Sequence, residues 1–64
     1  MQTQTLKDRH GHITGFVETR TDGVMVLKDE HRHIRGYYDP RSDQTKDAHM
    51  HLVGYGNTLL QLLG

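Results

Sequence analysis

A ten-residue motif recurs three times in this chain of 64 residues. Its copies are residues 7–16, 28–37 and 46–55, and they share the form Lys-Asp-x-His-x-His, followed by an aliphatic residue, x, Gly and an aromatic residue. A repeat of this size indicates a supersecondary unit that cannot bury its apolar face alone and therefore packs on copies of itself. This repeat motif constrains the fold more than any single residue does.

Each repeat motif predicts a β-hairpin. In the first copy, Asp8 can cap the backbone of a tight turn and Gly11 accepts a positive φ angle. The residues that follow alternate as in a β-strand. Asp22 and Gly23 form a strong hairpin-turn signal before the second copy. Residues 24–28 predict a further strand, and its four consecutive apolar residues, 24–27, indicate burial on both faces.

The residues after the third copy predict a short helix, because Asn57 or Thr58 suits an N-cap and four leucines form one apolar stripe. Such a short helix is unstable alone in water, so its leucines need a buried surface. They either plug the open mouth of the chain's own sheet, which we favour because apolar residues are scarce, or pack in a partner subunit. The four are Leu59, Leu60, Leu62 and Leu63.

These elements predict an all-β fold, a meander of three repeated β-hairpins that forms a small, shallow, barrel-like domain with a short C-terminal helix. Hydrophobic residues make up only 33% of the chain, and it has no cysteine for a disulfide. We therefore expect stabilisation from further copies of the chain. The single domain is 1–64, with repeats at about 6–20, 24–39 and 45–56 and the helix at 57–63.

All six histidines occupy two matching positions of the repeat motif. The His-x-His spacing places two imidazoles on one face of a strand, a common arrangement of metal ligands, and zinc or nickel would suit it. The other interpretation is that the first histidine of each pair lies in the turn, where it faces solvent and tolerates left-handed backbone. The better ligand candidates are His12, His33 and His51, and the weaker ones are His10, His31 and His49.

Charge is balanced, with eight lysines and arginines against eight acidic residues. Without surplus positive charge we expect no nucleic-acid partner. Protonation of the six histidines, at a pH below about 6.5, would make the chain strongly positive, which favours a pH-responsive role as an alternative. The chain shows no signal segment, and its longest apolar run is far shorter than the ~20 residues of a membrane helix. We expect no transmembrane segment and a cytoplasmic location.

A glycine recurs in the middle of each predicted strand, where glycine normally weakens a sheet. We expect these glycines to permit the close approach of a neighbouring segment. A functional alternative is a shallow pocket for a small apolar or lipid-like ligand. The aliphatic residue two positions before each glycine should point to the same face and converge on a shared axis. The glycines are Gly15, Gly36 and Gly54, and the aliphatic residues are Ile13, Ile34 and Leu52.

The aromatic residues of the repeat motif, Phe16, Tyr37 and Tyr55, are expected on the same face as the strand histidines. Because aromatic residues are enriched in interface cores, we expect them, with the C-terminal leucines, to make oligomer or ligand contacts. The sequence contains no nucleophile beside a base, no phosphate-binding glycine loop and no recognisable carboxylate pair. We therefore do not expect an enzyme.

The repeat motif, from its aspartate to x-Gly-aromatic, and the ending from Gly56 to Leu63 resemble the β-flower family of small bacterial proteins. The resemblance covers nearly the whole chain from Leu6. It implies a shallow symmetric barrel of radial hairpins around an apolar centre, in a family whose function is largely unassigned. This chain differs in its turn histidines, in Arg32 and Met50 at the position of the turn glycine, and in having three copies instead of four.

The function that we expect is a small structural or interaction module acting as a self-associating homo-oligomer. One alternative is a histidine-dependent metal-binding or pH-responsive protein. Another is a protein that binds a small apolar or lipid-like ligand.

Overall fold

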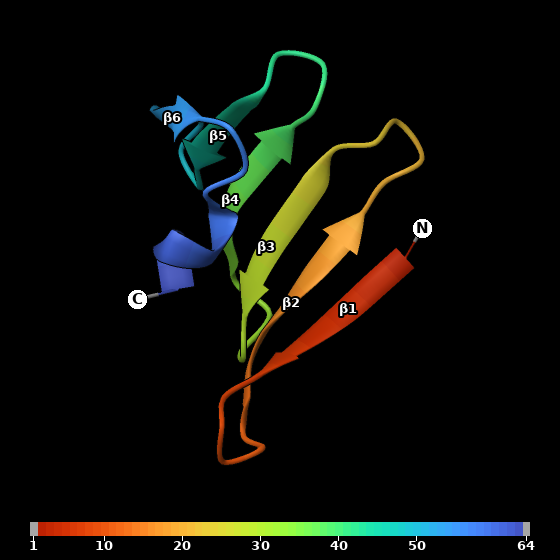
Figure 1. Ribbon diagram of the computed structural model, residues 1–64, viewed down its shortest axis with the longest axis vertical. Helices are drawn as coiled ribbons and strands as arrows, with labels where there is room; N and C mark the ends of the chain where they lie inside the picture. The colour runs from red at the N-terminus through yellow and green to blue at the C-terminus, as the bar shows by residue number, and fades with distance from the viewer. Residues whose placement is uncertain (1, 64) are drawn as a thin grey trace.

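The computed structural model describes residues 2–63 as an antiparallel sheet followed by one short helix (Figure 1). The strands pair in chain order from β1 to β6, which confirms the all-β meander of three hairpins. Hairpin 1 is β1–β2, hairpin 2 is β3–β4 and hairpin 3 is β5–β6. The elements are β1 (Gln2–Lys7), β2 (Ile13–Thr19), β3 (Met25–Asp29), β4 (Ile34–Asp39), β5 (Gln44–Asp47), β6 (Leu52–Tyr55) and the 3₁₀ helix η1 (Leu59–Leu63).

The sheet is shallow and open. Within residues 2–63, β1 pairs only with β2, and β6 pairs only with β5. Figure 1 shows β1 and β6 at opposite ends of the sheet. Both therefore present one free row of backbone donors and acceptors.

The three hairpins share one backbone design. Each ladder shifts register immediately before the lysine of the repeat motif, at Lys7, Lys28 and Lys46. Each turn also contains a residue with positive φ, which is Gly11 (81°), Arg32 (65°) or Met50 (67°). Hairpins 2 and 3 thus adopt the turn of hairpin 1 without its glycine, although left-handed backbone costs a side-chain-bearing residue about 1–2 kcal/mol.

The core lies on one face of the sheet, which we call the helix face. Val17, Leu27 and Leu59 are buried there, with exposed fractions of 6%, 0% and 2%. η1 contacts β3 and β4 of its own chain. Leu59, Leu62 and Leu63 therefore pack on their own sheet, which was the favoured expectation, whereas Leu60 is 63% exposed. The residues that pack around this core are Leu6, Met25, Tyr38, Leu62 and Leu63.

The opposite face of the sheet, which we call the open face, carries Phe16, Val26 and Tyr37. The register places Phe16 opposite Lys28, and Val26 opposite Tyr37, so these side chains share one side. Phe16 and Val26 are 8% and 3% exposed. Because Leu27 is buried on the helix face, the adjacent burial of Val26 and Leu27 confirms that β3 is covered on both sides.

The aliphatic residues Ile13, Ile34 and Leu52 do not converge on the core. Their exposed fractions are 43%, 38% and 50%, contrary to the expectation of a shared axis. The leucines of η1 lie against Gly15 and Gly36, which are two residues further from the hairpin turns than Ile13 and Ile34. The apolar centre is built instead by Val17 and Leu27 on the strands and by the leucines of η1.

Candidate functional site

Each repeat motif places its aspartate as the cap of a hairpin turn. In hairpin 1, Oδ1 of Asp8 accepts hydrogen bonds from the backbone N–H groups of His10 (2.8 Å) and His12 (3.0 Å). Asp29 and Asp47 accept the equivalent pairs of bonds at 2.8–2.9 Å. The fixed spacing from aspartate to the two histidines therefore follows from the geometry of the turn.

The structure brings the histidines together in pairs at the tips of the hairpins. The ring centroids of each pair lie 6.2–6.3 Å apart. The second histidine of each pair also places its Nδ1 3.7–3.8 Å from Oδ2 of the capping aspartate. Its side chain is about four-fifths exposed in all three hairpins, namely at His12, His33 and His51.

The three histidine pairs are not brought together into one centre. Within residues 2–63, no group of three or more His, Asp or Glu side chains has an arrangement that could hold a metal ion. The first histidines also do not occupy the left-handed backbone position suggested by their tolerance for it, because the next residue along each turn adopts the positive φ. The first histidines are His10, His31 and His49.

The turn caps perturb two carboxyl groups. The backbone N–H of His33 donates to Asp29 and, with the N–H of His31, holds the pKa of Asp29 below its usual value. The backbone N–H of His51 has the same effect on the pKa of Asp47. Both carboxylates are therefore stabilised in their charged form beside an exposed imidazole.

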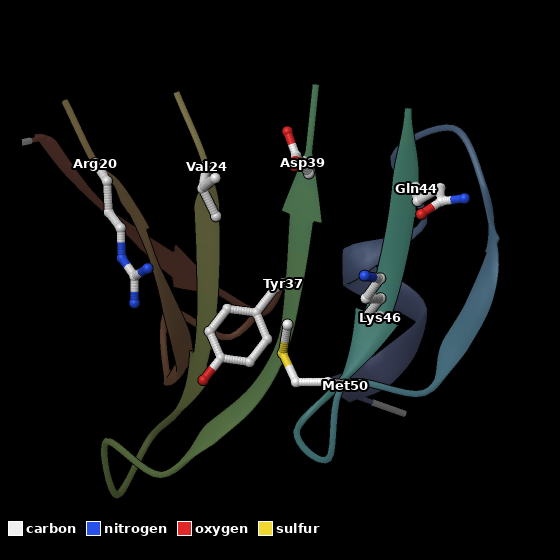
Figure 2. Close-up of a pocket in the computed structure, with 7 residues that line it drawn as sticks. All are labelled: Arg20, Val24, Tyr37, Asp39, Gln44, Lys46 and Met50. Carbon is white, nitrogen blue, oxygen red and sulfur yellow. The ribbon is translucent and has the colours of Figure 1, made fainter. Parts of the chain in front are cut away.

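Phe16 and Tyr37, the aromatic residues of the first two copies, each lie beside the turn of the next hairpin. The Arg32 guanidinium carbon lies 4.3 Å from the centroid of the Phe16 ring. Met50, at the matching position of the next turn, lines the same cavity as Tyr37, and Figure 2 shows its side chain pointing toward that ring. Within residues 2–63 no hairpin follows Tyr55, and its exposed fraction is 70%.

The repeat glycines likewise differ between the first two copies and the third. A β-carbon on Gly15 would lie 2.5 Å from the carbonyl oxygen of Lys28, and one on Gly36 would lie 2.7 Å from that of Lys46. These close approaches confirm the reason expected for both glycines. Gly54 occupies the third matching position, yet a β-carbon there would meet nothing within 4 Å.

Exposed apolar side chains gather on hairpin 3. β6 and its preceding turn carry four of them, and η1 carries Leu60, while Leu62 and Leu63 are half-buried. β6 is also an edge strand, so its apolar side chains accompany unpaired backbone groups. The four residues are Met50 (56% exposed), Leu52 (50%), Val53 (44%) and Tyr55 (70%).

Sequence reasoning missed the charged residues around Tyr37, because they are far apart in the sequence. Lys46 belongs to the third copy of the repeat motif, whereas Arg20 and Asp39 lie between copies. Arg20, Asp39 and Lys46 line the cavity there together with Met50. An alignment of the copies with the residues that follow them could have found the signal, since Glu18 lies two residues after the first copy and Asp39 two residues after the second.

No family model, curated protein or solved structure matches this chain. Among residues 2–63, no helix has the length and apolar character needed to cross a membrane.

Proposed function

We propose that the protein is a structural or interaction module that assembles with copies of itself. β6 of one copy pairs with β1 of the next, so that the meander continues across the junction. Such a contact joins two different surfaces and repeats from copy to copy. When the copies close into a ring, no free strand edge is left.

The open position at Gly54 is the observation that carries this proposal. Within the chain, Gly15 and Gly36 each receive the carbonyl of the lysine that opens the next repeat motif. Continuing the repeat across a junction brings Lys7 of a second copy to Gly54. The same continuation places that Lys7 opposite Tyr55, as Lys28 lies opposite Phe16.

The two free edges also complement each other in apolar character. β6 offers the exposed side chains of Leu52 and Val53. Beside β1 lies a cavity of about 180 Å³ that is lined by Leu6, Leu59 and Leu60, among others. Apolar side chains of a second copy would gain buried area at this edge, at about 25 cal/mol per Å² removed from water.

The pairing can be tested by a disulfide across the junction, because the chain has no cysteine of its own. We expect the variant Lys7→Cys with Tyr55→Cys to form covalent dimers and larger species on mild oxidation. As the matched control, Gln2→Cys with Tyr55→Cys moves one thiol five residues along β1, which is roughly 16 Å. Only monomer in the first variant, or equal crosslinking in both, would contradict the pairing.

A second candidate function is histidine-dependent metal binding or a pH response. It is favoured by the three equal histidine pairs, each beside a carboxylate. Two imidazoles of one turn would supply part of a zinc or nickel site, and a second molecule would complete it. Thermal melting with and without either ion tests this candidate, since a ligand that binds the folded state raises the midpoint. An unchanged midpoint at neutral pH would contradict it.

A third candidate function, the binding of a small apolar or lipid-like ligand, is favoured only by the cavity beside β1. The space above Gly15 and Gly36 is occupied by Leu63 and Leu62 of the same chain. The cavity beside β1 is also the one that the proposed neighbour would fill.

A further inference from the structure

A cavity of about 300 Å³ lies on the open face, away from η1. Figure 2 shows Tyr37 in its middle, Arg20 and Lys46 on either side, and Met50 pointing toward the ring, with η1 behind the sheet. Its volume is at the lower end for small-molecule sites, which typically measure about 300–1,000 Å³. The cavity therefore suits a small ligand.

The two cations that flank Tyr37 are free of ion pairs within residues 2–63. Arg20 is held by a turn, in which its N–H donates to the carbonyl of Val24 (2.9 Å) and its carbonyl accepts from Gly23 (3.0 Å). Its guanidinium carbon lies 5.8 Å from the centroid of the Tyr37 ring. An aromatic surface and two available positive charges thus share one cavity.

The matching place between hairpins 1 and 2 is closed by the chain's own side chains. There, Lys28 pairs with Glu18 at 3.1 Å. The Arg32 guanidinium covers the ring of Phe16 at 4.3 Å. At this place the lysine is already paired and the ring is already covered by groups of the chain itself.

Two substitutions between the copies open the place between hairpins 2 and 3. Asp39 stands where Glu18 does, is one methylene shorter, and uses its Oδ1 to accept the backbone N–H of Arg41 at 2.9 Å. It makes no ion pair with Lys46. Met50 stands at the turn position that Arg32 occupies in hairpin 2, so a thioether takes the place of the guanidinium that covers Phe16 at 4.3 Å. The Arg20 guanidinium near Tyr37 is more distant, at 5.8 Å.

We propose that this cavity binds a small molecule in which a planar aromatic ring carries an anionic group. The ring stacks on Tyr37 and contacts the polarisable sulfur of Met50. The anionic group pairs with Lys46 or Arg20 through charge-assisted hydrogen bonds. Asp39 is the one acidic side chain that lines the cavity, so the lining keeps a net positive charge.

Adenosine 5′-monophosphate is a suitable probe because it joins a planar base to a phosphate. Titration into the ¹⁵N-labelled protein should give saturable shifts at the amides of Tyr37 and Lys46. Adenosine alone and inorganic phosphate alone should each bind more weakly, since each makes only one half of the contact. Removing both charges in Arg20→Gln with Lys46→Gln should weaken binding about tenfold or more.

The control variant, Arg9→Gln with Arg41→Gln, removes the same net charge from two exposed side chains that do not line this cavity and should bind as the wild type does. The absence of saturable shifts, an equal loss in both double variants, or phosphate binding as tightly as the nucleotide would overturn the proposal. The spectrum also reports whether each variant is folded. If the variant Arg20→Gln with Lys46→Gln is unfolded, the single variant Arg20→Gln, which alters an exposed side chain, is compared with Arg41→Gln by the same criteria.

Discussion

The carbonyl oxygen of Lys46 lies 2.7 Å from the point where a β-carbon on Gly36 would stand. The same relationship joins Lys28 to Gly15, at 2.5 Å. Both distances are far below ordinary van der Waals contact, and these two carbonyl oxygens belong to the backbone, which cannot rotate away. At Gly36 a side-chain methyl group of Leu62 also obstructs this point. Neighbouring hairpins of this sheet therefore depend on a glycine at each junction.

We expect Gly36→Ala to destabilise the fold by about 2–3 kcal/mol, because the added methyl group forces the β4–β5 junction apart. Gly54→Ala is the matched control. It adds the same methyl group at the third copy of the motif, where nothing lies within 4 Å, and should change stability by less than about 0.5 kcal/mol. Urea unfolding of both variants measures the difference at a chain concentration at which the wild type is monomeric, so that loss of assembly in Gly54→Ala does not contribute. Equal losses would contradict the close approach at Gly36.

Leu59 should be the residue of η1 on which the fold most depends. It is 2% exposed and joins Val17 and Leu27 in the core. We expect Leu59→Ala to cost about 3 kcal/mol, a large share of the stability of so small a domain. Leu60→Ala, at a side chain that is 63% exposed, should cost far less in the same denaturation experiment. A similar loss from both variants would show that η1 does not pack as described.

The left-handed turn residues predict a stabilising substitution. Met50 has φ 67° and an exposed side chain, so Met50→Gly relieves backbone strain and should raise the free energy of unfolding by about 0.5–1 kcal/mol. Arg32→Gly should gain less, because it also removes the cation that covers Phe16, an interaction of about 0.5–1 kcal/mol. The prediction fails if thermal unfolding shows the larger gain for Arg32→Gly.

The capping aspartates predict how stability depends on acid. Folding lowers the pKa of Asp29 and Asp47 from the usual value of 3.8, chiefly through the backbone N–H groups of His33 and His51. A lowered pKa stabilises the fold at pH values above 3.8, and this contribution is lost as the pH falls through the folded-state pKa. The urea concentration at the midpoint of unfolding should therefore decrease as the pH is lowered below about 4.

Asp29→Asn with Asp47→Asn should flatten this acid dependence, because the amide keeps an acceptor oxygen but does not titrate in this range. Asp22→Asn, which alters a capping aspartate outside the repeat motif, serves as the control. If the variant Asp29→Asn with Asp47→Asn keeps the acid dependence of the wild type, other groups govern that dependence.

The local design of the fold could be predicted from the repeat motif, because its aspartate, its turn and its alternation depend on neighbouring residues alone. Gly15 and Gly36 were also anticipated, since a glycine repeated in mid-strand needs a nearby backbone. The exposure of Ile13 and Ile34 could not be anticipated, because it depends on how far η1 reaches along the sheet.

The candidate sites were less predictable because they depend on differences between copies. The cavity at Tyr37 arises from one missing methylene at Asp39 and from Met50 in the turn, which matter only once hairpins 2 and 3 lie side by side. Likewise, Gly54 and Tyr55 resemble their counterparts in sequence, but no hairpin packs beside them in the part of the chain that the structure describes.

Self-association through β6 and β1 is tested most directly by sedimentation velocity of the wild type and Gly54→Ala over a range of micromolar concentrations. We expect the wild type to form a defined oligomer. Gly54→Ala should remain folded by circular dichroism but sediment as a monomer, because its methyl group meets the Lys7 carbonyl of the next copy. A wild type that stays monomeric, or a Gly54→Ala variant that assembles as the wild type does, would contradict the proposed assembly.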